Sequence, residues 1–210
     1  VTPYSLNGIL LSECRNGVTI TQNKVILAST GENLYGILLT DCNMDGSQPG
    51  LVANNFISLG VDNASLYGLY IYNTHKTRYL YNSIQLYGSN NPFSTCIIAQ
   101  CQVEPFSFDN SLVNNNVYNR TEGYAMYLHA SASQQNFFAE SDYNNLLSEG
   151  NYLAYARDLE LQDLAAWRSF TGFDTHSISV DPMFVSETDL HSTSTQIDDA
   201  GVPRMEVTTD

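Results

Sequence analysis

The chain has 210 residues, the size of one domain. Its formal net charge is −14 with only eight Lys and Arg, which argues against binding to nucleic acid or to an anionic membrane surface. No apolar run reaches the roughly 18 residues that a membrane-spanning segment needs, so membrane insertion is not expected. A hydrophobic fraction of 43% excludes wholesale disorder.

One pattern is written twice between residues 34 and 86, first as LYGILLTDC…NNFISLG and then as LYGLYIYNT…YNSIQLYG. Gly36 and Gly68 stand at matching points of the two copies, 32 residues apart. Such a period indicates stacked supersecondary units. Further copies align at intervals of 27 to 29 residues, at Gly8, Thr95 and Tyr124.

Apolar residues recur at every second position within each short run, which is the period of a β-strand. We expect the inward positions of the first strand to be Ile9, Ile37, Leu69, Cys96 and Ala125, then Leu11, Leu39, Ile71, Ile98 and Tyr127. A second strand supplies Val25 and Leu27, Ile57 and Leu59, Ile84 and Leu86, then Val117. No helical period intervenes. The pattern therefore predicts an all-β fold, a right-handed parallel β-helix of about five coils over residues 1–150.

The outward positions of the first strand are unexpectedly apolar: Leu10, Leu38, Tyr70, Ile97 and Met126. Such a row is normally covered by another element or used as an interface between copies of the chain. Residues 158–171 have the apolar spacing of a helix, with Gly172 as a stop. We expect this short helix to be the cover of that row, lying against the flank or end of the β-helix and capping its last coil. Residues 151–210 are thus predicted to be a helix and an irregular capping tail of the same domain.

Four asparagines share one place in the repeat, two residues before a core residue: Asn23, Asn55, Asn82 and Asn115. Turned inward, each side chain would hydrogen-bond the turns of its own and neighbouring coils, forming an asparagine ladder. The alternative is four exposed loop asparagines. The repeated register favours the ladder.

Small residues close the first strand of successive coils: Cys14, Cys42, Thr74, Cys101 and Ala130. Cys14 and Cys42 fall in adjacent coils, where a bridge is conceivable. Side chains that point the same way from stacked strands would strain a disulfide, so we expect buried free thiols.

These motifs resemble a known family. The Gly-Ile-x-Leu and Asn-x-Ile repeats, the SDYNNLL segment at 141–147, the LQDLAAWRSFTGFDTHSISVDPMFV segment at 161–185 and IDDAGVP near the end resemble right-handed parallel β-helix proteins of the pectate-lyase-like superfamily. More narrowly, the chain looks like the β-helix domains of large secreted or surface-attached bacterial proteins. The resemblance implies an extracellular or cell-surface location and neighbouring domains of a longer parent chain. Family members include polysaccharide lyases and hydrolases.

A polyuronate lyase needs a base to remove the proton next to the carboxyl group and a cation to neutralise that carboxylate. His75, Lys76 and Arg78 form the basic cluster, and they are the candidate catalytic residues. The alternative is a solvated turn, and an acidic domain would repel an acidic glycan. The paired-Asp, Gly-His-Gly and Arg-x-Lys signatures of the pectin hydrolases are missing. Glu13 and Asp41, at equivalent outward positions, remain open as a carboxylate pair.

Asp41, Asn43 and Asp45 match the first half of an EF-hand loop and are a candidate Ca²⁺ site. The position that should carry a bidentate glutamate is Val52, so a turn rich in Asx residues is the alternative. No other cofactor is expected.

Two functions remain. The favoured one is a non-catalytic extracellular module that binds polysaccharide or cell-surface glycan, or serves adhesion or spacing. Its candidate sugar-stacking rings are Tyr70, Tyr72, Tyr79 and Tyr81. The alternative is a polysaccharide lyase or glycoside hydrolase that acts in a groove along the β-helix.

Overall fold

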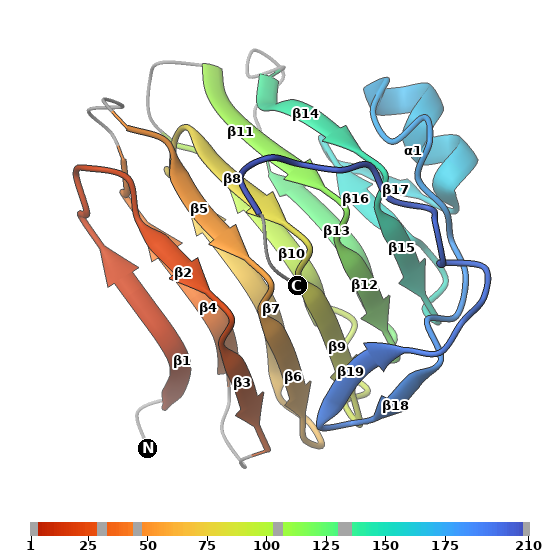
Figure 1. Cartoon of the computed structure of the whole chain (residues 1–210). Helices are drawn as coiled ribbons and strands as arrows, with labels where there is room; N and C mark the ends of the chain where they lie inside the picture. Colours follow the sequence, from red (N-terminus) through yellow and green to blue (C-terminus); the bar gives the residue numbers. More distant parts are fainter. Residues whose placement is uncertain (1–3, 29–32, 44–47, 103–106, 130–135, 208–210) are drawn as a thin grey trace.

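A computed structural model of the chain describes residues 4–28, 33–43, 48–102, 107–129 and 136–207. Each coil contributes one strand to each of three sheets, and strands of successive coils pair in parallel (Figure 1). The predicted all-β parallel β-helix of about five coils is confirmed.

The three sheets run the length of the solenoid. Sheet A contains β1 (Ser5–Ser12), β4 (Asn33–Thr40), β7 (Ser65–Tyr72), β10 (Thr95–Gln100), β13 (Tyr124–His129), β16 (Ala154–Ala156) and β17 (Leu159–Leu161). Sheet B contains β2 (Thr19–Thr21), β5 (Gly50–Ala53), β8 (Thr77–Leu80), β11 (Ser107–Val113) and β14 (Asn136–Asp142). Sheet C contains β3 (Lys24–Leu27), β6 (Phe56–Gly60), β9 (Ser83–Tyr87), β12 (Asn116–Asn119) and β15 (Asn145–Ser148).

The core lies between the three sheets, where the inward side chains of one coil pack on those of the next. Ile37 and Leu69 from sheet A, Val52 from sheet B and Ile57 from sheet C are fully buried. Burying a side chain of this size stabilises the fold by about 1.5–3 kcal/mol relative to leaving it in water. The core is therefore a column of similar layers.

The structure corrects the register of the fourth and fifth coils by one residue. Leu69 pairs with Ile97, and Ile97 pairs with Met126, whereas the sequence alignment had paired Leu69 with Cys96. Ile97 and Met126 are fully buried, so their predicted outward position is wrong. Because side chains alternate between faces, a slip of one residue exchanges the inner and outer sets.

The outward row of sheet A therefore has different members in these coils. Ile98 and Tyr127 lie in line with Tyr70, so the predicted inward position of Ile98 and Tyr127 is also wrong. The observed row is Leu10, Leu38, Tyr70, Ile98, Tyr127 and Tyr155.

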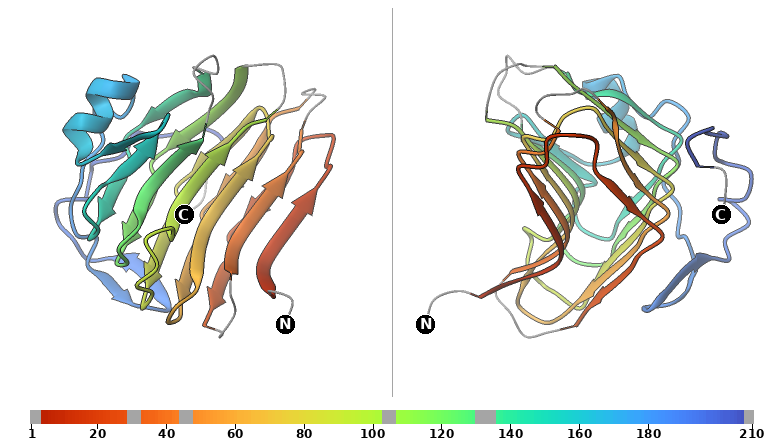
Figure 2. Two further views of the ribbon diagram at one scale, coloured as in Figure 1. Left: turned by 180° about the vertical axis from the view of Figure 1, so that it is seen from behind. Right: turned by 60° about the vertical axis from the view of Figure 1, so that its left-hand side comes forward.

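The helix α1 (Leu164–Thr171) is shorter than predicted. The Asp163 side chain accepts a hydrogen bond from the Ala166 backbone N–H at 2.8 Å and fixes the first turn, and the residues before it form β17. The helix ends at Gly172, as predicted, in a left-handed conformation with φ of 76°. Trp167 is fully buried, and α1 caps the end of the solenoid opposite β1 (Figures 1 and 2). The helix therefore does not cover the outward row.

After α1 the chain returns along the outside of sheets C and B. The hairpin of β18 (Phe184–Ser186) and β19 (Asp189–Ser192) contacts β6 and β9, and the rings of Phe56 and His191 meet edge to face at 4.9 Å. Further on, the Tyr81 hydroxyl donates to the Val202 carbonyl at 2.9 Å. The tail thus covers sheets B and C and leaves the outer face of sheet A open (Figure 2, right). Among the described residues, no helix has the length and apolar character needed to cross a membrane.

Candidate functional site

The predicted asparagine ladder is present and sets the turn between sheets B and C. The backbone N–H and the side-chain amide of Asn55 donate to Asn82 Oδ1 at 3.2 and 2.9 Å. Asn23 donates in the same way to Asn55, and Asn82 to Asn115, at 3.0 Å in each contact. Asn55, Asn82 and Asn115 are at most 1% exposed, so the alternative of loop asparagines in solvent is wrong.

The ladder has a further member that the sequence reading missed. Asn115 donates to Asn144 Oδ1 through its backbone N–H and its side chain, at 2.9 and 3.1 Å. The signal was available, because Asn144 stands two residues before the buried Leu146, inside the SDYNNLL segment.

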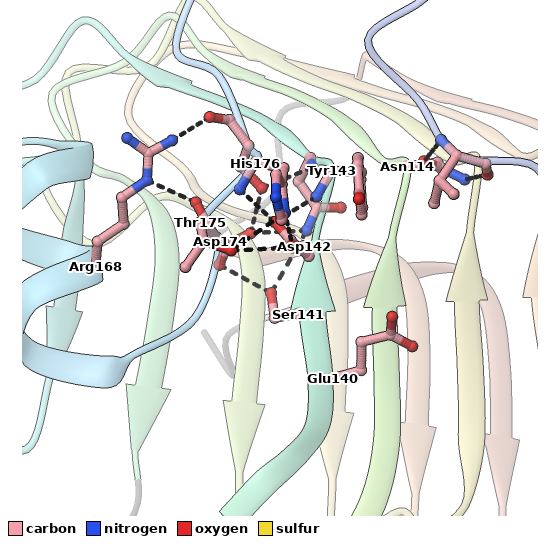
Figure 3. Close-up of polar contacts among 12 residues, drawn as sticks. Asn114, Glu140, Ser141, Asp142, Tyr143, Arg168, Asp174, Thr175 and His176 are labelled. Carbon is pink, nitrogen blue, oxygen red and sulfur yellow. Dashed lines mark hydrogen bonds and ion pairs between the residues drawn. The ribbon is translucent and has the colours of Figure 1, made fainter.

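A buried carboxylate ends the ladder (Figure 3). Asp174 Oδ1 accepts from Asn144 Nδ2 at 2.9 Å and from the Ser177 hydroxyl at 2.6 Å. Asp174 Oδ2 accepts from the Trp167 indole N–H at 2.7 Å and from the Ser141 hydroxyl at 2.9 Å. With four donors converging on it, this carboxylate joins the helical cap to the last coil, which is a structural role.

The residue before each ladder asparagine has a left-handed backbone. The φ angles lie between 54° and 59°, at Gln22, Asn54, Tyr81, Asn114 and Tyr143. Left-handed backbone is costly for residues other than glycine and is tolerated best by asparagine. The turn is thus held by the ladder rather than by local preference.

The most site-like surface is the outer face of sheet A. Besides Tyr72, six described tyrosines project from it, and we call these six the tyrosine face: Tyr35, Tyr67, Tyr70, Tyr124, Tyr127 and Tyr155. They arise because parallel in-register strands place equivalent residues one above another, about 4.8 Å apart. The sequence reading identified Tyr70 alone among them. The repeated LYG and the GYAMY segment contained the signal for most of the others.

The tyrosine face consists of two clusters. On β4 and β7, the ring of Tyr35 lies 4.9 Å from that of Tyr67 and 5.6 Å from that of Tyr70. On β13 and β16, the rings of Tyr127 and Tyr155 stack at 4.7 Å with their planes 9° apart. Aromatic groups at these separations attract one another and hold their rings in place.

A groove lies between the two clusters. Its floor is β10, whose outward residues Thr95, Ile98 and Gln100 are smaller than the tyrosines on either side. Phe93 and His129 complete the lining, and the cavity has a volume of about 310 Å³. The backbones of β7 and β13 are two strand spacings apart, roughly 10 Å. The groove is therefore wide enough for one flat ring to fit between the two tyrosine clusters.

The chemistry of the groove is neutral. Among the described residues, its lining includes no Lys, Arg, Asp or Glu. Burial, with a smaller contribution from neighbouring phenols, raises the pKa of Tyr70 to about 12. Burial and the hydrogen bond to Glu160 raise the pKa of Tyr124 to about 12. These hydroxyls keep their protons at physiological pH, and that of Tyr70 donates to Gln100 Oε1 at 2.7 Å.

Comparison with family models, with curated proteins and with solved structures gave no match.

The other predicted stacking rings differ in their surroundings. Tyr72 projects from sheet A beside Tyr70, but its hydroxyl donates to Gln102 at 2.8 Å and it does not line the groove. Tyr79 is fully buried because it points inward from β8, so its predicted exposure is wrong. Tyr81 is held under the tail by Val202 and Arg204.

Of the candidate catalytic residues, His75 and Lys76 lie in the turn between β7 and β8, as expected, whereas Arg78 lies on β8; none of the three lines the groove. His75 is 5% exposed, and burial lowers its pKa, with Lys76 adding to the effect and Asp109 opposing it. Lys76 is exposed at this turn. Arg78 forms an ion pair with Glu206 of the tail at 3.2 Å. The structure thus gives the three side chains different surroundings, and a catalytic role for them stays a prediction.

The candidate Ca²⁺ site can be followed only in part. Asp41 accepts hydrogen bonds from Asn73 Nδ2 at 2.9 Å and from the Thr40 hydroxyl at 3.0 Å, and these contacts belong to the turn. The Asn43 side chain is buried and donates to the His75 carbonyl at 3.0 Å. Asp45 lies outside the described residues. Within those residues no group of three or more potential metal ligands occurs, and the Ca²⁺ site stays a prediction.

The cysteines are free, as expected. Cys42, Cys96 and Cys101 are buried, and Cys14 in the first coil is half-buried. Burial raises the pKa of the Cys42 thiol to about 11, which disfavours the reactive thiolate. The remaining candidate, the Glu13 and Asp41 pair, sits at equivalent turn positions with φ of 54° and 51°.

Proposed function

We propose that this protein is a non-catalytic module of a secreted or surface-attached bacterial protein and that it binds a polysaccharide in the groove of the tyrosine face. The observation that carries the proposal is the pairing of two tyrosine clusters across a low floor on β10. The parallel β-helix agrees with the resemblance to the pectate-lyase-like superfamily. The extracellular location in this proposal is taken from that resemblance.

The groove suits a neutral sugar ring. The C–H faces of a pyranose pack against aromatic rings, and its hydroxyls need donors and acceptors at the edges. The amide of Gln100, the hydroxyl of Thr95 and the ring of His129 supply such groups within the lining. No Lys or Arg is present among the described lining residues to neutralise a uronic acid, and the net charge of −14 would repel one.

Binding without turnover is favoured over the alternative of a lyase or hydrolase. A glycosidase needs two carboxyl groups flanking the bond to be cleaved, and a lyase needs a base with a cation beside it. The part of the groove lining that the structure describes contains neither set. The basic cluster near His75 lies elsewhere, with His75 buried.

The test is a binding and turnover assay on a panel of polysaccharides. The expected result is saturable binding of a neutral glycan, no binding of polygalacturonate, and no new reducing or unsaturated ends with or without Ca²⁺. Tyr70→Ala and Tyr127→Ala should each weaken binding by about tenfold, because each removes one wall of the groove.

Tyr118→Ala is the matched control. Tyr118 is also half-buried but projects from sheet C, outside the groove, so its removal should leave affinity unchanged. Release of products at a steady rate would overturn the proposal. So would equal binding by the wild-type chain and the Tyr70→Ala and Tyr127→Ala variants.

A further inference from the structure

The two ends of the β-helix are built differently. At the C-terminal end, β17 turns antiparallel to β16, α1 covers the core, and Asp174 closes the ladder. At the other end, β1, β2 and β3 are the edge strands of sheets A, B and C. Within the described part of the chain, no element pairs with their outer edges (Figure 2, right).

The first coil leaves part of its core in solvent. Leu6 is 42% exposed, whereas Leu34, its partner in the second coil, is fully buried. Ile9 and Leu11 are half-buried, and the corresponding residues of the second coil are fully buried. These side chains point into the solenoid and lack only a layer above them. Covering them would remove apolar surface from water, which favours association.

The asparagine ladder has a direction, and its open end is at Asn23. In each described coil from the second to the fifth, the ladder Oδ1 accepts from the backbone N–H and the side-chain amide of the coil before. Asn23 donates its backbone N–H and its side-chain amide to Asn55, and the same amide also donates to the Thr21 carbonyl. No donor among the described residues reaches Asn23 Oδ1. This oxygen therefore presents an acceptor to whatever lies on the first coil.

That polarity decides which occupant fits. A second copy placed end to end in the opposite sense would present its own Asn23 acceptor, so that two acceptors would face each other. A second copy in the same sense would present α1 and the buried Trp167, which cover its last coil. Neither offers an N–H pair to Asn23. A coil of the same repeat in the same sense does.

We propose that the first coil is a docking surface for one further coil of the same repeat, joined to it in cis, with an asparagine at the ladder position. Every later first strand is reached from sheet C, as β4 is from β3 and β7 from β6 (Figure 1). A coil that finishes beside β3 and runs into Ser5 would follow the same path. It would extend all three sheets, cover Leu6, Ile9 and Leu11, and donate to Asn23 Oδ1.

The experiment adds such a coil to the full chain. Residues 33–64, which precede Ser65 in the native order, are copied directly in front of Ser5, because Ser65 and Ser5 occupy equivalent register positions. Amide hydrogen exchange in β1, β2 and β3 is then compared with that of the unextended chain. We expect at least tenfold slower exchange in all three strands.

Two controls separate a docked coil from a mere tail. A scrambled extension of the same composition should give no protection. The extension with its copied Asn55 replaced by alanine should give less protection at Asn23 and in β2 and β3 than the native copy. Equal protection from the scrambled sequence, unchanged exchange with the native copy, or destabilisation of the chain by the copy would each overturn the proposal.

A second variant reports on the surface itself. Leu6→Ala should have a small effect on the unfolding midpoint of the unextended chain and a clearly larger effect in the extended chain, because only there is Leu6 covered. The same small effect in both chains would overturn the proposal. A concentration-dependent doubling of the mass of the unextended chain, with β1 to β3 protected, would also overturn it and assign the surface to a second copy.

Discussion

A ladder asparagine stabilises this fold because its amide replaces backbone partners that the turn cannot supply. Asn82 Oδ1 receives two hydrogen bonds from Asn55, and its Nδ2 donates to the Val52 carbonyl at 2.9 Å and to Asn115. Asn82 is 1% exposed, so water cannot take over these contacts. Leaving a buried donor or acceptor without a partner costs about 1–3 kcal/mol.

Replacing Asn82 by alanine should therefore lower the free energy of unfolding by about 3 kcal/mol or more. Asn23→Ala is the matched variant at the open end, where no described donor reaches Oδ1 and solvent is near. Its expected loss is about 1 kcal/mol. Urea unfolding of both variants measures the difference. Equal losses would contradict the view that burial makes the ladder valuable.

The left-handed backbone of the turn leads to a substitution that should increase stability. Gln22 is exposed and has φ of 57°, at the position where the second coil has Asn54 and the fourth has Asn114. Gln22→Asn should raise the free energy of unfolding by about 0.5–1 kcal/mol, since asparagine tolerates the left-handed region better. Gln162→Asn, at an exposed described site without positive φ, should change little. No gain at Gln22 would count against this reading of the turn.

At the scale of the elements, the strand period predicts the sheets. It does not fix the register between neighbouring strands in coils that lack the glycine by which the first strands are aligned. Gly36 and Gly68 mark the second and third coils, because a Cβ at either would lie within 2.5 Å of an isoleucine methyl group of sheet C. In the fourth coil Cys96 occupies the position of this glycine, so the sequence offers no glycine to align. The alignment placed Thr95 there instead, and this error of one residue assigned Ile97 to the wrong face of the sheet. Helix α1 was predictable in position and in its Gly172 end, but its start depended on the Asp163 cap.

The tyrosine face depends on that register. With Ile97 and Met126 assigned to the outer face, the sequence predicted aliphatic side chains there in the fourth and fifth coils. It therefore did not predict the groove between Tyr70 and Tyr127. The buried position of Tyr79 was equally hidden, because the second of the three strands has a weak period. The tail contacts of Tyr81 and Arg78 follow no period at all, so sequence patterning had no means to predict them.

Two tyrosines of sheet A, Tyr70 and Tyr124, should lose their protons at a higher pH than ordinary tyrosines. The pKa of Tyr70 is raised to about 12, mainly by burial, and that of Tyr124 to about 12 by burial and Glu160. Because the folded pKa lies above the ordinary value near 10, this contribution to stability is complete below about pH 10 and is lost as pH rises toward 12.

Tyrosinate absorbance near 295 nm, followed against pH in the folded chain, measures this directly. We expect a late phase near pH 12 that Tyr70→Phe reduces, and constant glycan binding between about pH 8 and 9, since the phenols keep their protons there. Titration of Tyr70 near its ordinary value of about 10 would contradict the buried, neutral groove.

At the scale of the whole molecule, the solenoid divides its surface by role. Sheets B and C carry the tail, the C-terminal end carries α1, and the first coil and sheet A stay open among the described residues (Figures 1 and 2). The proposed role of the first coil is to bind a further coil of the β-helix, and the proposed role of the outer face of sheet A is to bind a glycan. The two proposals rest on different residues and can fail separately.

The most direct test of the binding claim is calorimetric titration of the wild-type chain and of Ile98→Trp with a neutral oligosaccharide. Ile98 is on the floor of the groove and points outward from β10, so an indole there fills the space between the tyrosine walls and leaves the core between the sheets unchanged. We predict saturable binding by the wild-type chain and no measurable binding by Ile98→Trp at equal thermal stability. Undiminished binding by the folded Ile98→Trp chain would contradict the account.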